Sequence, residues 1–130
     1  KKIQSQSTSN PTSISQVAAQ AALEGNQQCV KDMVKVFKQR HDYMVKALNE
    51  IDGIECLAGD GTFYVFPDFS GMQTKLGCNT DTDLAEKLLE AGVALVPGSA
   101  FGTPGHMRIS FATSDENLQK SIERLKAASI

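Results

Sequence analysis

The stretch His-Met-Arg-Ile-Ser-Phe-Ala, residues 106–112, decides how the rest of the sequence is interpreted. Apolar and polar residues alternate in it, and successive side chains of a strand point to opposite faces of a sheet. The pattern therefore predicts a half-buried β-strand. The face that we expect to pack on helices holds Met107, Ile109 and Phe111. The opposite face holds His106, Arg108 and Ser110.

Arg108 follows a glycine-rich loop, residues 97–105, and the two are expected to be neighbours. A guanidinium held on a strand offers paired N–H donors that match a carboxylate or a phosphate. An ordinary surface arginine paired with an aspartate is the alternative. The loop lacks a Gly-Lys-Ser/Thr ending and precedes a strand rather than a helix, so it fits a turn better than a phosphate-binding loop.

Helices and further strands are predicted on the N-terminal side of this strand, and one helix follows it. Helical spacing and capping residues indicate helices over 13–24, 26–51, 81–91 and 115–125, capped by Ser13 with Gln16, by Thr80 or Asp81, and by Ser114. Strand-like runs cover 54–57, 62–66 and 93–96; residues 58–61 are expected to join the first two as a hairpin, and 68–80 to form a loop. This order predicts an α+β fold, in which helices cover a small antiparallel or mixed sheet.

Composition narrows the class of protein. The chain has 130 residues, a net charge of −2 and 41% hydrophobic residues, which fits one small domain and argues against a nucleic-acid partner. Its apolar runs are too short to span a membrane, and no leader sequence is seen. Three widely spaced cysteines indicate a reducing, cytoplasmic location. The opening Lys-Lys-Ile, without Met, is typical of a piece of a larger protein.

The residue types that usually carry catalysis do not assemble into a site. Cys29, Cys56 and Cys78 lack the spacing of metal ligands. His41 is expected on a solvated helix face, far from His106 in the sequence. Core packing is the simplest role for the aromatic run at 63–66, although Phe63 is placed to line a cleft. We therefore predict no catalytic residue and no metal site.

Four segments together resemble the C-terminal third of a class I aminotransferase, most of all the bacterial aspartate type. They are Gln4–Gln16, Gly61–Phe66, Val93–Gly102 and Arg108–Ala112. The resemblance implies the small domain of a fold type I enzyme, with Arg108 clamping the substrate α-carboxylate and Phe63 beside it. It also implies that Ser9 and Asn10 lie near the active site of the neighbouring subunit.

The same resemblance implies pyridoxal 5′-phosphate, amino acid and 2-oxo acid substrates, and a homodimer in the intact enzyme. Residues 1–25 then belong to the large cofactor-binding domain, 26–51 form a long interdomain helix, and 52–130 form the small domain. The family's Schiff-base lysine motif is absent and is expected just before residue 1. No cofactor-binding residue is therefore expected here, and the chain alone should neither bind the cofactor nor transaminate.

Other functions remain open on the sequence. The chain is alternatively a stand-alone regulatory module that binds small carboxylates through Arg108, or an assembly domain that uses the alanine-rich helix 13–24 as an interface. Within the aminotransferases, an aromatic amino acid, prephenate or alanine is an alternative to aspartate. No arginine precedes the Ser-Asn-Pro segment, where some relatives use one to bind the distal carboxylate.

Overall fold

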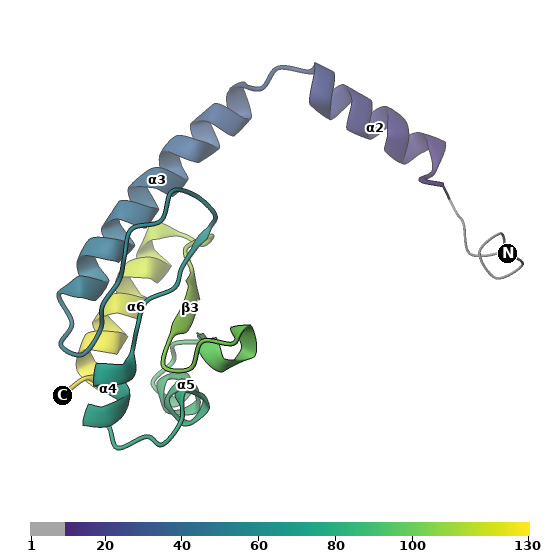
Figure 1. The fold of residues 1–130 in the computed structure, drawn as a ribbon. Helices are drawn as coiled ribbons and strands as arrows, with labels where there is room; N and C mark the ends of the chain where they lie inside the picture. The colour runs from purple at the N-terminus through teal and green to yellow at the C-terminus, as the bar shows by residue number, and fades with distance from the viewer. Residues whose placement is uncertain (1–9) are drawn as a thin grey trace, which may run out of the picture. The chain divides into compact units, whose positions relative to one another are not determined.

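The structure is a computed structural model, and it describes residues 10–130 of the chain. Contacts within it divide the chain into two compact units, residues 1–34 and residues 35–130. The fold class is α+β, as predicted (Figure 1). Among the described residues, no helix combines the length and the apolar character needed to cross a membrane.

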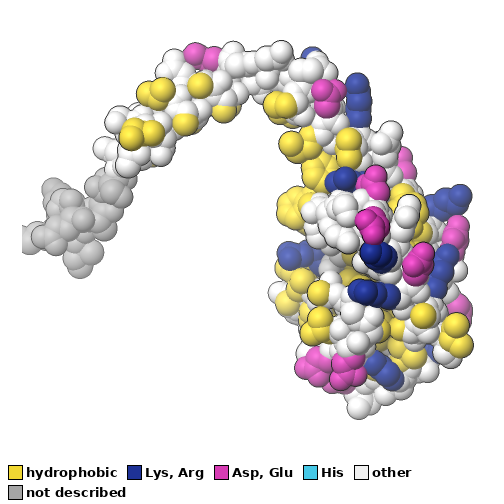
Figure 2. Space-filling view, turned by 180° about the vertical axis from the view of Figure 1, so that it is seen from behind, with side chains coloured by type: hydrophobic (Ala, Val, Ile, Leu, Met, Phe, Trp, Pro, Cys, Tyr) yellow, Lys and Arg dark blue, Asp and Glu magenta, His cyan; other side chains and the backbone are white. Residues whose placement is uncertain are grey.

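The first unit contains helix α2, Ser13–Glu24, and the start of helix α3, Gln28–Asn49. The predicted cap at Ser13 was wrong by one residue: the side chain of Thr12 accepts the N–H of Ser15, and Gln16 donates to the carbonyl of Pro11 instead. No residue of α2 is buried. Its hydrophobic side chains lie on the surface, as Figure 2 shows, and include Ile14, Val17 and Leu23.

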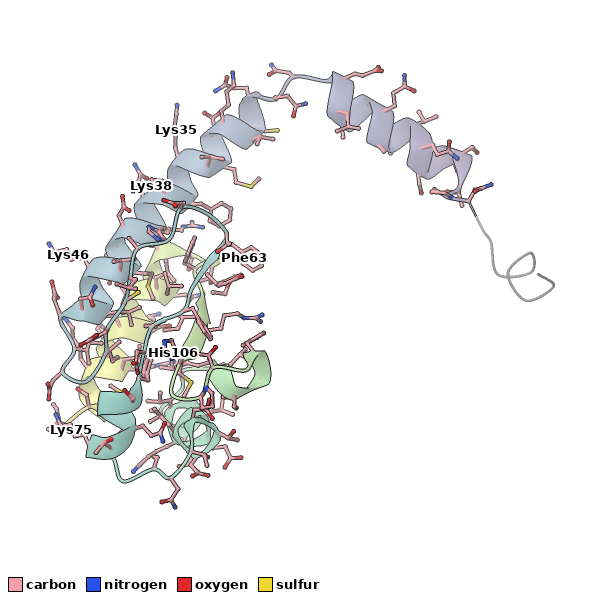
Figure 3. The ribbon with its side chains drawn as sticks, in the orientation of Figure 1. Lys35, Lys38, Lys46, Phe63, Lys75 and His106 are labelled. Carbon is pink, nitrogen blue, oxygen red and sulfur yellow. The ribbon has the colours of Figure 1, made fainter. Side chains whose placement is uncertain are left out.

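In the second unit, α3 continues and runs parallel to the last helix, α6, Asp115–Ala128 (Figure 1). Two ion pairs link them, one at the start of α6 between Arg40 and Asp115 (2.7 Å), the other near its end between Glu50 and Lys126 (3.1 Å). Three lysines of α3 in this unit, Lys35, Lys38 and Lys46, point away from the sheet (Figure 3) and are exposed. Ser114 caps α6, as predicted.

Three short antiparallel strands form the sheet, in the order β1-β3-β2. They are β1, Tyr64–Val65; β2, Val96–Pro97; and β3, Met107–Ser110. Tyr64 pairs with Ser110 and Val96 pairs with Arg108. The central strand β3 is therefore the one that the alternating stretch predicted. β2 is shorter than the predicted strand 93–96 and includes Pro97, which an edge strand tolerates.

The predicted hairpin between residues 54–57 and 62–66 was wrong. Glu55 forms an isolated bridge with Asp68, and β1 pairs with β3. The reason lies in Asn49, whose side chain accepts the N–H of Cys56 (2.9 Å) and donates to its carbonyl (2.8 Å). Because the helix satisfies these backbone groups, the segment needs no partner strand at Cys56.

Two further helices lie between β1 and β2. The predicted loop 68–80 was partly wrong, since it contains helix α4, Ser70–Lys75. Helix α5, Asp81–Glu90, begins at a capping box made by Thr80 and Asp83. After β2 the chain forms a short 3₁₀ helix, η1, over Gly98–Phe101, before it enters β3. η1 lies in the glycine-rich loop, which is thus a turn, as the sequence indicates.

The core of the second unit lies where α3, α4, α5 and α6 meet the inner face of the sheet. Its fully buried side chains are Met44, Leu48, Phe69, Met72, Leu84, Leu88, Met107, Phe111 and Leu125. At one edge the backbones of Gly53 and Gly71 touch: a Cβ on Gly71 would lie 2.7 Å from the Cα of Gly53, and one on Gly53 would lie 2.5 Å from the N atom of Met72. Gly53 also has a left-handed φ of 85°.

Candidate carboxylate-binding site

The two faces of β3 have opposite surroundings, as the alternation predicts. Met107, Ile109 and Phe111 are at most 5% exposed. The ring of Phe111 meets the rings of Phe37 and His41 edge-on, with each pair of centroids 5.9 Å apart. On the other face the side chains are half-buried or exposed. The packed face fixes the strand, and the open face presents Arg108.

Arg108 lies between two aromatic rings. Its Cζ atom is 4.9 Å from the ring centroid of Phe101 in η1 and 5.6 Å from that of Tyr64 in β1. Such cation–π contacts hold a guanidinium in place without using its N–H donors. Within residues 10–130 no carboxylate pairs with Arg108, whereas Arg40 pairs with Asp115. The alternative of a surface arginine paired with an aspartate is therefore not what the described residues show.

The turn before β3 brings η1 back onto the strand. The N–H of Gly98 donates to the carbonyl of His106 (2.7 Å), and the N–H of Thr103 donates to the carbonyl of Gly98 (3.0 Å). A Cβ on Gly98 would lie 2.2 Å from the carbonyl oxygen of Thr103, so only glycine fits. This close approach is what places Phe101 beside Arg108.

Phe63 lies at the opposite end of β3 from His106 (Figure 3). Its carbonyl accepts the N–H of Phe111 (2.9 Å), and its ring, 5.5 Å from that of Tyr64, is 54% exposed. The prediction that this ring packs in the core was therefore wrong, because Phe63 lies at the exposed border of the open face of the sheet, which we call the rim. The preceding residue, Thr62, has a φ of 68°, which is rare for a β-branched residue.

His106 and Asp68 extend the open face next to Arg108, and sequence reasoning missed this pair. The ring of His106 lies against that of Phe66 (5.2 Å), and its buried Nδ1 atom has no partner among the described residues. Burial by itself raises the pKa of Asp68, but the N–H of Ser70 (2.7 Å) and the nearby His106 outweigh it and lower that pKa. Asp68 and His106 come together because their backbones form an isolated antiparallel bridge. The sequence does not predict this pairing, because strand register cannot be derived from it.

Three further residues that the sequence singled out are Ser9, Asn10 and His41. Ser9 lies outside the described residues, and Asn10 is an exposed residue of the first unit. The prediction of a solvated His41 was wrong, since it is only 6% exposed. Its Nε2 atom accepts the N–H of Gly59 (3.1 Å), which leaves the proton of a neutral ring on Nδ1, facing Asp42. The signal was present, because position 41 continues the apolar stripe of Phe37 and Met44.

A family model described as "Aminotransferase class I and II" matches residues 1–125. The chain belongs to this family. It is 49% identical over 130 residues, 95% of its length, to the "Aspartate/prephenate aminotransferase" of Nitrosomonas europaea. The crystal structure of the aspartate aminotransferase from Rhizobium meliloti superimposes over 98% of the chain, with a TM-score of 0.89 and 45% identity. The alanine aminotransferase from Pyrococcus furiosus covers 92%, with a TM-score of 0.84 and 34% identity.

The chain spans about a third of these class I and II aminotransferases: 33% of the N. europaea protein, 33% of the R. meliloti chain and 30% of the P. furiosus chain. The R. meliloti structure matches both the helices and the sheet described above, so the predicted likeness to fold type I aminotransferases is confirmed. The resemblance that the four sequence segments indicated is confirmed as well.

The described part of this aminotransferase chain does not fit pyridoxal phosphate. A lysine that traps the aldehyde of such a cofactor is activated by burial in an apolar pocket or by a neighbouring cation. Every described lysine is exposed, and several are paired, as Lys75 is with Asp52 and Lys120 with Glu116. No cluster of three possible metal ligands occurs in residues 10–130 either.

Proposed function

We propose that the full-length protein is a pyridoxal-phosphate-dependent aminotransferase that converts L-aspartate and 2-oxoglutarate to oxaloacetate and glutamate. Membership of the family and the names of its relatives in N. europaea and R. meliloti support this activity. The observation that carries the role of this chain is Arg108, whose guanidinium lies between two rings and has no carboxylate partner among residues 10–130.

Arg108 binds the α-carboxylate of the substrate in this proposal. Two parallel N–H donors of a guanidinium match the two oxygens of a carboxylate, and such charge-assisted pairs are about twice as strong as neutral ones. The packed face of β3 and the rings of Tyr64 and Phe101 restrain the side chain before the substrate arrives. Phe63 on the rim contributes an apolar wall. The result is a substrate held in one orientation.

The remaining parts of the site belong to the rest of the full-length protein. The cofactor is held outside residues 10–130, since no described lysine fits it, and the chain alone is inactive for that reason. We propose that residues 1–25 are part of the large domain, 26–51 the interdomain helix and 52–130 the small domain. Ser9 and Asn10 then approach the neighbouring subunit of a homodimer. The free thiols of Cys29, Cys56 and Cys78 agree with a reducing cytoplasm.

The amino-group donor is the part of the proposal on which relatives of this chain differ, because they are named for different substrates. The N. europaea relative is named for prephenate as well as aspartate, and the P. furiosus structure is an alanine aminotransferase. Aspartate is favoured because it appears in the names of the relatives from N. europaea and R. meliloti, which are 49% and 46% identical to this chain. A comparison of kcat/KM for aspartate, alanine and phenylalanine as donors, and for prephenate as acceptor, decides between them.

The decisive experiment is Arg108→Lys in the full-length protein. Lysine keeps the charge but loses the paired donors, so KM for aspartate rises and kcat falls, together lowering kcat/KM about tenfold or more. Arg124→Lys is the matched control, because Arg124 is exposed and donates to the carbonyl of Gly92 (2.7 Å). Equal kinetics in both variants would remove Arg108 from the site. Absence of transamination by the parent protein would remove the proposed activity.

A further inference from the structure

Asp81 is a buried acid with no place in the carboxylate-binding site described so far. It is the first residue of α5 and is 4% exposed, and no Lys, Arg or His of residues 10–130 pairs with it. Its Oδ2 atom accepts the N–H of Ser99, 2.7 Å away and 18 residues further along the chain. A buried carboxylate is costly unless it is hydrogen-bonded, so the bond from Ser99 stabilises Asp81 and ties α5 to the segment that contains Ser99.

The contact holds the beginning of η1. Ser99 is the second residue of this short helix, where an N–H has no partner within the helix itself. The N–H of the first residue, Gly98, donates to the carbonyl of His106 (2.7 Å). The first two N–H groups of η1 are therefore fixed by α5 and by the residue before β3. The last residue of η1 is Phe101, which contacts the guanidinium of Arg108.

Asp81 is thus linked to Arg108 through a short and continuous path. Its carboxylate fixes Ser99, and η1 carries Phe101 two residues later to within 4.9 Å of the Cζ atom of Arg108. Phe101 is 49% exposed, and the ring of Phe66 meets it edge-on, with the two centroids 6.0 Å apart. The anchor at Ser99 adds a restraint on the backbone that carries this ring.

We infer that Asp81 is a positioning residue for substrate recognition, because its buried carboxylate fixes η1 and η1 holds the ring of Phe101 against Arg108. This inference rests on the proposed function, since it assigns Asp81 to a site whose task is to bind the carboxylate of an amino acid. Without the contact, Phe101 moves away and the guanidinium samples orientations in which its paired donors miss the carboxylate. Substrate binding weakens, and the chemical step after binding is changed less.

The test compares Asp81→Ala with Asp83→Ala in the full-length protein. Both variants remove a carboxylate from the first turn of α5, where it interacts favourably with the helix dipole. Asp83 accepts the N–H of Thr80 (2.9 Å), within its own capping box, and does not reach η1. A comparison of the two variants therefore distinguishes destabilisation of α5, which both cause, from loss of the hydrogen bond to η1, which only Asp81→Ala causes.

Binding is measured with succinate, which is aspartate without its amino group, and kinetics with aspartate. Asp81→Ala raises the Kd for succinate and the KM for aspartate about fivefold, with kcat changed less than about twofold. Asp83→Ala leaves both binding values unchanged. Asp81→Asn, whose amide oxygen still accepts the N–H of Ser99, recovers most of the loss. Equal binding by the Asp81→Ala and Asp83→Ala variants would overturn the inference.

A double-mutant cycle with Phe101→Leu tests the route. Phe101 is half exposed, so Phe101→Leu leaves the core intact, and it raises the Kd for succinate about as much as Asp81→Ala does. If Asp81 acts through Phe101, Asp81→Ala has no further effect in the Phe101→Leu background. Multiplying effects would overturn the inference. Asp81→Ser replaces Asp81→Ala if the latter fails to fold, because serine suits the first turn of a helix but is too short to reach Ser99.

Arg108→Lys distinguishes the two proposals. If Arg108→Lys weakens succinate binding while Asp81→Ala and Asp83→Ala behave alike, only the positioning role of Asp81 fails. If Arg108→Lys has no effect on succinate binding, the carboxylate site itself fails and the role of Asp81 fails with it.

Discussion

The two faces of β3 differ in what surrounds them, although their residues alternate along four positions of one strand. One face is sealed by the core, where Phe111 packs on Phe37 and His41 of α3, and it is at most 5% exposed. The other carries Arg108 between the rings of Tyr64 and Phe101, and its guanidinium has no carboxylate partner among residues 10–130. The sealed face therefore supplies stability, and the open face is available for recognition. Substitutions on the two faces should accordingly have separable effects.

Phe111→Ala on the sealed face has the largest expected effect. Removing a ring that is 1% exposed and packed on Phe37 and His41 costs about 3–5 kcal/mol of unfolding free energy. Denaturant unfolding of the 130-residue chain measures it. Phe101→Ala is the control, because it removes the same atoms from a ring that is 49% exposed, with a loss below about 1 kcal/mol. Similar losses in both variants would show that the faces do not differ in this way.

Arg108→Ala on the open face is expected to reduce catalysis strongly and stability only modestly. Its loss removes two cation–π contacts, so the unfolding free energy falls by about 1–2 kcal/mol, which is less than for Phe111→Ala. In the full-length protein it lowers kcat/KM for aspartate about a hundredfold, because two charge-assisted hydrogen bonds are lost. Denaturant midpoints and steady-state kinetics of the same preparation give both numbers. A large loss of stability with little change in kcat/KM would contradict the division of roles.

Asp68→Asn gives a smaller and pH-dependent effect at the edge of the open face. The pKa of Asp68 is lowered in the folded chain from its ordinary value of 3.8, so between the two values the unfolded chain binds more protons. The stabilisation from the ionised carboxylate is present above the ordinary pKa and is lost as pH falls through the lowered one. The wild-type chain should therefore lose more stability than Asp68→Asn on acidification from about pH 5 to pH 3.

Asp60→Asn controls for the general effect of acid, because the exposed carboxylate of Asp60 has no hydrogen bond from the described residues. Its stability should fall with pH in parallel with that of the wild-type chain. If Asp68→Asn does the same, then Asp68 has no specific part in the acid response.

Local signals in the sequence predicted a large part of the second unit. The alternation in β3 identified its buried face. The cap at Ser114 was placed correctly, and Thr80 was one of the two candidates for the cap of α5, because capping depends on neighbouring residues. The hairpin failed because a side chain of α3, Asn49, takes the backbone groups of Cys56. Helix α4 was missed because Gly71 and Gly77 indicate a loop, and its position depends on a contact with the distant Gly53.

The candidate site was predictable in its central residue but not in its surroundings. The side on which Arg108 lies follows from the period of two along a strand. Its ring partners, Tyr64 and Phe101, reach it from 44 and 7 residues away only through strand register and the turn at η1. The anchor from Asp81 to Ser99 is a contact between a side chain and a distant backbone group, for which no local pattern exists.

The contact between Gly53 and Gly71 has a consequence for how sequences of this kind can diverge. With two backbones this close, a side chain at either position displaces the other segment, so neither glycine can be replaced alone. A second side chain would add to the clash rather than relieve it, so homologous sequences with this backbone should retain glycine at both positions.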